Sequence, residues 1–501
     1  MPYLLIFFCC FLFSLSAASH TALYNSLDPY SISEHLAFYE LYKDTEEGKR
    51  ALQDAWRLLA QNSGEEHHTP LPLALQDEIA KLIQLIHPHT AAKEMPLEIS
   101  EQSLTALEQI AATLPNRRLK GYYATSQEEL LQLTPEEIDL AHGLFLLQFP
   151  DDPKKVKAYE AAIDFMALQI LARCPFSATN QEKIIAINNF IFFEMEFRFP
   201  PHSTYADTID HFTFLSSVLE SRRGVCLGVS VLYLAIAQRM DLPLTIITPP
   251  GHIFLSDGTI NIETTARGIH IPLDEYYSLT TKMLKKRTMK EVLGMVWVNQ
   301  ASLFLSRGDF EKAAQIYEQA LPFMPNDSML QTFLGCSYLL SGKEKEGKKL
   351  LKAIPEDEES ISGDYLADDI INKKVPYNCL KALFMHVDET KKSIEAKKET
   401  LLQSLEKAPQ FRSALFQLAT CYLQLRRPKE AIATLEKLHA QDPDDITCEY
   451  YLAALYHDRM NDPQAYSHFL CARKIAAAHS LFPRPLRELQ AALAASSPMG
   501  E

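Results

Sequence analysis

The spacing of hydrophobic and polar positions divides the chain into three stretches. Residues 20–150 carry apolar residues at helical spacing with irregular interruptions, and they predict a helical N-terminal region. Within it, Thr134-Pro135-Glu136-Glu137 has the form of a capping box with proline at the first helical position. This motif predicts a helix that runs to about Gln148. Nothing in the region indicates a function.

Residues 151–275 predict a domain that mixes helices and strands. Apolar residues recur every three or four positions in 156–174 and 180–197, which is typical of two helices. The run VCLGVSVLYLAIAQRM at 225–240 is apolar on nearly every side, and this pattern indicates a buried helix.

Three short alternating runs follow that helix, and they predict strands in an antiparallel sheet. They are LTIIT at 244–248, HIFL at 252–255 and TINIETT at 259–265. Asp257-Gly258 is a strong hairpin signal. If these two residues form the loop, His252 lies directly opposite Glu263 on one face of the sheet.

The last stretch, residues 294–480, repeats itself with a period of 34. Pro443 follows Pro409 by 34 positions, and Ala465 follows Ala431 by 34. The segments GDFEKAAQIYEQALPFMPND (308–327) and RRPKEAIATLEKLHAQDPDD (426–445) resemble the second helix of a tetratricopeptide repeat. This period places repeat starts near 294, 328, 378, 412 and 446, with small residues where paired helices touch, at Ala301, Gly335, Ala419 and Ala453. The resemblance implies an all-α solenoid with a concave face for a protein or peptide partner.

The N-terminus has the form of a secretory signal peptide. An apolar run from Tyr3 to Ala18 ends in small residues, although no Lys or Arg precedes it. We expect residues 1–19 to be removed near Ser19, which predicts a secreted, periplasmic or cell-envelope protein without an integral membrane span after cleavage. An uncleaved anchor or a buried hydrophobic helix is the alternative.

Charge and cysteine usage exclude several classes of function. The net charge of −15 argues against a nucleic-acid binder, and KMLKKR at 282–287 is interpreted as a short solvated patch. Seven cysteines follow the apolar run, with wide spacings and no CxxC, so neither a zinc site nor a dense disulfide framework is expected. No metal or other cofactor is predicted, and lone histidines are interpreted as surface residues: His386, His439 and His457.

Cys226 stands apart from the other cysteines because it opens the apolar helix directly after Arg-Arg-Gly-Val. Amides at a helix N-terminus favour an anion, so we expect a lowered thiol pKa, to which Arg222 and Arg223 would add. A histidine held by a carboxylate is the usual partner of such a thiol. Cys226, His252 and Glu263 therefore form a candidate nucleophilic constellation; the alternative is a buried structural thiol.

Residues 155–268 resemble the transglutaminase-like superfamily, and within it the SirB-type bacterial branch. The stretches that carry the resemblance are FLSSVLESRRGVCLGVSVLYLAIAQRMDLPL, TPPGHIFL and INIETT. It implies an α+β fold, with a papain-like core in which a buried helix bears the nucleophile Cys226. A small antiparallel sheet would bear the base His252 and the orienting acid Glu263.

Two departures from the superfamily bear on function. The superfamily usually has Asp where this chain has Glu263, and many SirB-type members lack the cysteine that this chain keeps. Candidate oxyanion donors are Tyr205 and His211. Two functions stay open: acyl transfer or amide hydrolysis on a protein or peptide, and a non-catalytic scaffold that binds partners through the repeats.

Overall fold

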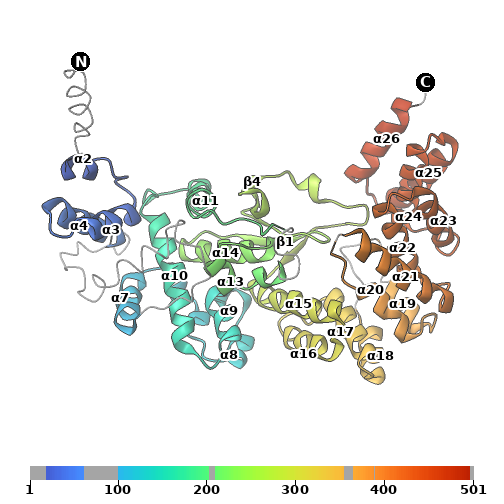
Figure 1. Cartoon of the computed structure of the whole chain (residues 1–501), viewed down its shortest axis with the longest axis horizontal. Coiled ribbons are helices and arrows are strands. Elements are labelled where there is room, and N and C mark those ends of the chain that lie inside the picture. Colours follow the sequence, from blue (N-terminus) through green and yellow to red (C-terminus); the bar gives the residue numbers. More distant parts are fainter. Residues whose placement is uncertain are drawn as a thin grey trace, which may run out of the picture.

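The computed structural model describes residues 19–60, 100–201, 209–354, 361, 365–388 and 390–496. The described elements follow one another along an elongated molecule, with the first helices at one end and the last helices at the other (Figure 1). The predicted signal peptide lies outside the described residues except for Ser19. No helix in the described ranges is both long enough and apolar enough to cross a bilayer.

The N-terminal region is helical, as its apolar spacing predicts. Its capping box forms, but it closes a single 3-10 turn, and a new helix begins at Leu140 with Asp139 as its N-cap. The predicted helix is therefore two elements, because Ile138 and Asp139 have extended backbone angles. The elements are α2 (His20–Tyr24), α3 (Ile32–Leu41), α4 (Glu46–Ala60), α7 (Glu101–Ala111), η3 (Pro115–Arg118), η4 (Lys120–Tyr123), α8 (Gln127–Gln132), η5 (Pro135–Glu137) and α9 (Leu140–Gln148).

The helices of the central domain surround α14 (Cys226–Arg239), whose residues from Leu227 to Ala237 are all buried. This burial agrees with the all-round apolar pattern of the segment. α14 packs against α9, α10, α13 and the short turn η7. The other helical elements are α10 (Pro153–Leu171), α11 (Asn180–Asn188), η6 (Asn189–Glu194), η7 (Ile209–Thr213) and α13 (Leu215–Ser221).

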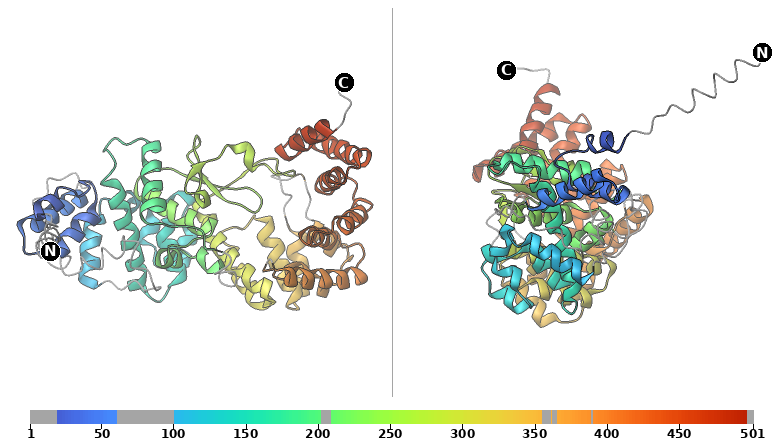
Figure 2. Two further views of the ribbon diagram at one scale, coloured as in Figure 1. Left: turned by 45° about the horizontal axis from the view of Figure 1, so that its top comes forward. Right: turned by 90° about the vertical axis from the view of Figure 1, so that its left-hand side faces the viewer.

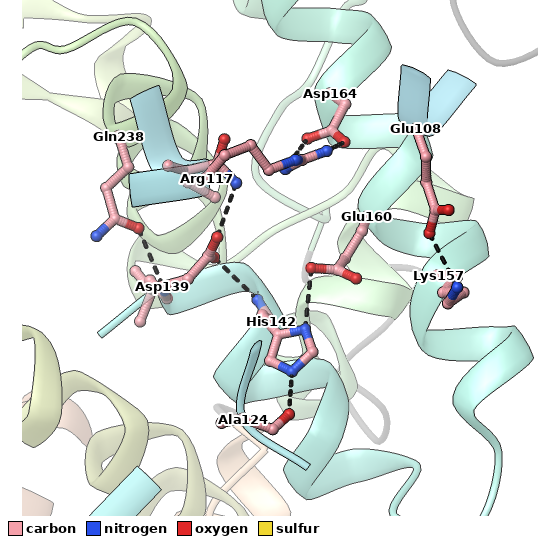
Figure 3. A network of polar contacts seen from close by, with 12 residues as sticks. Glu108, Arg117, Ala124, Asp139, His142, Lys157, Glu160, Asp164 and Gln238 are labelled. Atoms are coloured by element: carbon pink, nitrogen blue, oxygen red, sulfur yellow. Dashed lines mark hydrogen bonds and ion pairs between the residues drawn. The ribbon is translucent and has the colours of Figure 1, made fainter. Parts of the chain in front are cut away.

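A buried polar network holds the C-terminal end of α14 against the N-terminal region (Figure 3). Arg239 is fully buried, and its Nε donates to Asp164 Oδ1 on α10 at 2.5 Å. Arg117 from η3 pairs with the same carboxylate. Beside it, His142 Nδ1 lies 3.0 Å from Glu160 Oε1. A buried arginine is tolerated only when it is paired, so this network fixes how α9, α10 and α14 meet.

The sheet has five antiparallel strands in the order β4-β3-β2-β1-β5. Three of them were predicted, and the outer two were not. The strands are β1 (Thr245–Thr248), β2 (Phe254–Ser256), β3 (Asn261–Glu263), β4 (Ile269–His270) and β5 (Lys285–Arg287). The interpretation of 282–287 as a solvated patch is wrong for Arg287, whose side chain lies buried against Asp327, whereas Lys286 is exposed on β5.

The β2–β3 hairpin differs by two residues from the predicted register. Leu255 pairs with Ile262 and Ser256 with Asn261, so the central loop residues are Gly258 and Thr259. Gly258 has φ +97°, a conformation that suits glycine at the first central position of a two-residue turn. A shift of two residues keeps every side chain on its predicted face, whereas a shift of one would reverse them all.

The C-terminal stretch forms stacked antiparallel helix pairs that follow an arc (Figure 2). Pairs begin close to the predicted starts at 294, 328, 412 and 446, but the unit expected at 378 is irregular. There the first helix is replaced by the short elements η10 and α20. The helices are α15 (Met289–Arg307), α16 (Phe310–Ala320), α17 (Ser328–Leu340), α18 (Glu344–Lys352), α19 (Tyr365–Ile371), η10 (Tyr377–Leu380), α20 (Lys381–Phe384), α21 (Lys391–Lys407), α22 (Arg412–Gln424), α23 (Pro428–His439), α24 (Ile446–Asp458), α25 (Asp462–Ala478) and α26 (Arg484–Ser496).

The small residues of the repeats lie where the paired helices meet, as predicted. Ala301, Ala419 and Ala453 are buried. A Cβ added to Gly335 of α17 would lie 2.7 Å from Leu351 Cδ2 of α18. The two helices therefore approach closely because position 335 lacks a side chain.

Candidate functional site

A cavity of about 430 Å³ lies between the central domain and the first two helix pairs of the repeats. Its walls come from the N-terminus of α14, the β1–β2 connection, the segment around β5 and the helices α15 and α17. The lining residues are Cys226, Leu227, Thr248, Pro249, Pro250, Gly251, His252, Ile253, Thr280, Thr281, Met283, Lys285, Arg287, Met295, Val298, Asn299, Met324, Asp327, Ser328 and Met329. Two of the three candidate site residues, Cys226 and His252, therefore face one cavity.

Cys226 is the first residue of α14, and the backbone before it is held on two sides. Gly224 N donates to Arg198 O at 3.2 Å, and Val225 N donates to Phe212 O at 3.1 Å. A Cβ on Gly228 would lie 2.1 Å from the same Phe212 oxygen. The glycine two residues after Cys226 thus lets η7 pack directly on the start of the helix.

The expected lowering of the Cys226 pKa is not found. Burial raises the pKa of this thiol, and the charge of Glu263 acts in the same direction, although the backbone N–H groups of Leu227 and Cys226 oppose it. Sequence reasoning weighed the helix N-terminus but could not weigh the loss of water around the sulfur. The thiol of the free protein is therefore protonated at neutral pH.

His252 and Glu263 are in direct contact. His252 Nε2 lies 2.6 Å from Glu263 Oε2, in a pair whose carboxylate is buried and whose imidazole is 32% exposed. His252 precedes β2, so it is not directly opposite Glu263 in the sheet as was predicted. The two side chains instead make contact beyond the paired residues of β2 and β3. Ser230 Oγ on α14 lies 3.0 Å from Thr264 Oγ1, which ties this end of the sheet to the helix of Cys226.

Three further contacts hold Glu263 in place. Its Oε1 accepts hydrogen bonds from the backbone N and the Oγ1 of Thr265, and its Oε2 accepts one from Tyr276 at the end of η9 (Leu273–Tyr276). Burial would raise the pKa of Glu263, but the hydrogen bonds from His252 and Thr265 outweigh it, so the pKa lies below its usual value. The carboxylate is thus charged and fixed.

Tyr276 is a site residue that the sequence reasoning missed. Its ring stacks on Phe254 with centroids 3.9 Å apart and lies parallel to His252 at 5.9 Å. Tyr276 follows the predicted end of the domain by one residue, and no spacing linked it to Glu263. The contact between Thr265 and Glu263 could have been predicted, because a Thr two residues after a carboxylate often hydrogen-bonds to it.

The geometry leaves one nitrogen of His252 for chemistry. Because Nε2 is engaged by Glu263, Nδ1 is the atom that can exchange a proton, and it makes no hydrogen bond to the described residues. Among those residues no hydrogen bond or ion pair joins Cys226 to His252 either. The two side chains therefore share a cavity without being hydrogen-bonded to each other in the part of the chain that the structure describes. The nucleophilic role of Cys226 stays a prediction.

The candidate oxyanion donors do not extend the site. Tyr205 lies outside the described residues. His211 is exposed on η7 and is not among the described residues that line the cavity.

The side of the cavity formed by the repeats carries several apolar side chains, three of them methionines. Met295 and Val298 come from α15, and Met324 and Met329 flank the start of α17. Methionine side chains adapt readily to apolar groups of different shape. Asp327 pairs with both cationic side chains of the lining: Arg287 Nη1 donates to its Oδ2 at 2.6 Å, and Lys285 Nζ lies 4.0 Å from the same oxygen.

Comparison with family models finds two kinds of domain in the chain. Residues 157–296 match the model of the transglutaminase-like superfamily, and residues 296–327 and 398–455 match two models of the tetratricopeptide repeat. The chain thus carries a transglutaminase-like domain and tetratricopeptide repeats. The first match includes β5 and extends past residue 275, the predicted end of the domain.

No curated protein matches the chain. Among solved structures, "Crystal structure of MamA" is 16% identical, with a TM-score of 0.19 and coverage of 35% of this chain and 93% of that chain. "MamA RS-1 ArsTM double mutant" is 15% identical, with a TM-score of 0.21 and coverage of 37% and 96%.

Proposed function

We propose that the transglutaminase-like domain is a cysteine-dependent acyl-transfer or amide-hydrolysing unit that acts on a protein or peptide. The observation that carries the proposal is the placement of His252, which lines the same cavity as Cys226. Its Nε2 is held by the charged Glu263, so its Nδ1 can accept a proton.

The proposed reaction starts from a neutral thiol. Because burial keeps Cys226 protonated, His252 acts as a general base and removes the proton as Sγ attacks an amide carbonyl carbon. The C–N bond then breaks, the imidazolium gives its proton to the leaving amine, and a thioester remains. Water or a second amine attacks this thioester, His252 takes the proton of the attacking group, and the C–S bond breaks to restore the thiol.

Glu263 stabilises the imidazolium that forms in each half of this reaction and holds the ring in one orientation. Its own contacts to Thr265 and Tyr276 keep the carboxylate from turning away. In this scheme Glu263 and Tyr276 are positioning residues.

The cavity favours a substrate with an apolar group next to the reacting carbonyl. Met295, Met324 and Met329 would contact that group. Because these residues belong to the repeats, the repeats serve as part of the substrate site as well as a docking surface for the rest of a polypeptide.

The acyl-enzyme itself provides the test. Full-length protein is mixed with the 4-nitrophenyl ester of N-acetyl-methionine, quenched in acid and mapped by mass spectrometry. We expect the acyl group on Cys226 in the parent and in a Cys471→Ala control, and at least tenfold less of it in His252→Ala. Equal acylation in His252→Ala, or none at Cys226 in the parent, contradicts the proposal. Adding hydroxylamine to a reactive sample distinguishes an amine acceptor from water.

A non-catalytic scaffold is the second candidate, and the raised pKa of Cys226 favours it. The resemblance to the SirB-type branch, where the cysteine is often lost, points the same way. In that case the repeats alone bind a protein partner. Either function is proposed for a protein exported by its N-terminal segment.

A further inference from the structure

Two histidines and a glutamate meet near the C-terminal end of the repeats, far along the chain from Cys226. His439 is the last residue of α23, Glu449 lies in the first turn of α24, and His468 lies on α25. Each residue offers one ligand atom, and the three atoms all lie within 4.8 Å of one another. The sequence reasoning treated His439 as a surface residue, because its partners come from two other helices.

The carboxylate of Glu449 bridges the two imidazoles. It is fully buried, His439 Nδ1 contacts its Oε1, and His468 Nδ1 lies 2.8 Å from its Oε2. His468 is also buried, whereas 32% of the His439 side chain is exposed. The cluster is therefore enclosed by protein but reachable from solvent on the His439 side.

A second layer of contacts orients His468. Its Nε2 faces Glu436 Oε1 at 3.7 Å, and that same oxygen accepts a hydrogen bond of 2.8 Å from Tyr456. The Tyr456 ring stacks on the imidazole with an interplanar angle of 5°. Histidines that bind metals usually present their second N–H to a carboxylate in this way.

We propose that His439 Nδ1, Glu449 and His468 Nδ1 bind a divalent transition-metal cation of the Zn²⁺ class, with solvent as a fourth ligand on the exposed side. Two imidazoles and one carboxylate form a donor set that zinc accepts with an open position. Ligands at about 2.0–2.1 Å in tetrahedral geometry lie roughly 3.4 Å apart, so the present contacts need shifts of about 1 Å or less.

In the free protein, protons take the place of the cation. Each imidazole uses Nδ1 to hold the buried carboxylate, and metal binding requires both Nδ1 atoms without a proton. Protons and metal therefore compete, and affinity should fall as the pH is lowered from 8 to 6. Binding would join α23, α24 and α25 at one point and stiffen the end of the solenoid.

The test uses untagged full-length protein that has been treated with a chelator and dialysed. We expect one equivalent of Zn²⁺ by calorimetry and metal analysis, and visible absorption of tetrahedral type with Co²⁺. His439→Ala changes a half-exposed residue and should abolish both signals. Glu436→Gln should weaken the binding about 10- to 100-fold.

His457→Ala is the matched control, because His457 also faces one carboxylate, Asp462, at 3.7 Å but joins no cluster with a second histidine among the residues that the structure describes. It should bind like the parent. The absence of stoichiometric Zn²⁺ and Co²⁺ binding to the parent overturns the proposal, as does unchanged binding in His439→Ala. The first result would identify the cluster as a buried proton-linked ion pair.

Discussion

Replacing Gly228 with alanine tests how the first turn of α14 is built. In an isolated helix this change stabilises by about 1 kcal/mol, because alanine has the higher helix propensity. In this structure the added Cβ would lie 2.1 Å from Phe212 O and 2.9 Å from Val218 Cγ2. The nearest obstacle is a backbone oxygen, which cannot turn aside as a side chain can.

The two effects can be compared in magnitude. Overpacking of this kind costs about 1–3 kcal/mol. Moving Phe212 away also loses its hydrogen bond from Val225, worth about 0.5–1.5 kcal/mol. After the propensity gain is subtracted, we expect Gly228→Ala to destabilise the protein by about 0.5–3.5 kcal/mol. Because Val225 precedes Cys226, the displaced turn should also slow the reaction of Cys226 with its acyl donor.

Urea unfolding followed by circular dichroism measures the change. Gly143→Ala on α9 is the control, because its nearest neighbours would be side-chain ends, those of Leu293 at 3.1 and 3.3 Å and of Leu130 at 3.7 Å. This variant should stay within about 1 kcal/mol of the parent. A Gly228→Ala protein that is more stable than the parent would refute the close packing of η7 on α14.

Three further changes test other parts of the molecule. Gly335→Leu should overpack the contact with Leu351 and lower the free energy of unfolding by about 1–3 kcal/mol or more in the same assay. A parent-like unfolding transition would mean that the repeat is assigned wrongly at this position. Glu263→Asp should keep most acylation activity and Glu263→Gln should lose most of it. Folding lowers the pKa of Glu263, so its stabilising contribution is complete above about pH 4.5 and is lost as the pH falls through the lowered pKa. The difference in unfolding free energy between the parent and Glu263→Gln should therefore be smaller at pH 3 than at pH 6. An equal difference at the two pH values would contradict this linkage. Exported protein should begin near Ser19 on N-terminal sequencing, whereas an intact Met1 would favour an uncleaved anchor.

The spacing of apolar residues predicted much of the fold, because buried helices and paired helices require apolar or small residues at regular positions. The helix 225–240 and most helix pairs of the repeats belong to this class, and the small residues between paired helices follow from the same packing. The strand β5 was missed because its residues are Lys-Lys-Arg, and the burial of the Arg287 side chain depends on its tertiary partners Asp327 and Thr248.

The candidate site was predicted in its members but not in its electrostatics. The His252–Glu263 contact exists although the register is shifted, since the shift of two residues preserves the face of the sheet. The pKa of Cys226 was predicted in the wrong direction, because its burial depends on how distant segments close around it. Tyr276 and the cluster of His439, Glu449 and His468 depend on tertiary contacts that no short spacing reveals.

The rate of alkylation of Cys226 by iodoacetamide at pH 7 tests most directly whether Cys226 and His252 act together. Peptide mapping follows Cys226 and uses the exposed Cys471 of the same molecule as the reference thiol. If His252 removes the thiol proton, His252→Ala should slow the reaction at Cys226 at least tenfold and leave Cys471 unchanged. If Cys226 instead reacts only after unfolding, at a rate indifferent to His252, the cysteine is a packing residue and the catalytic proposal is wrong.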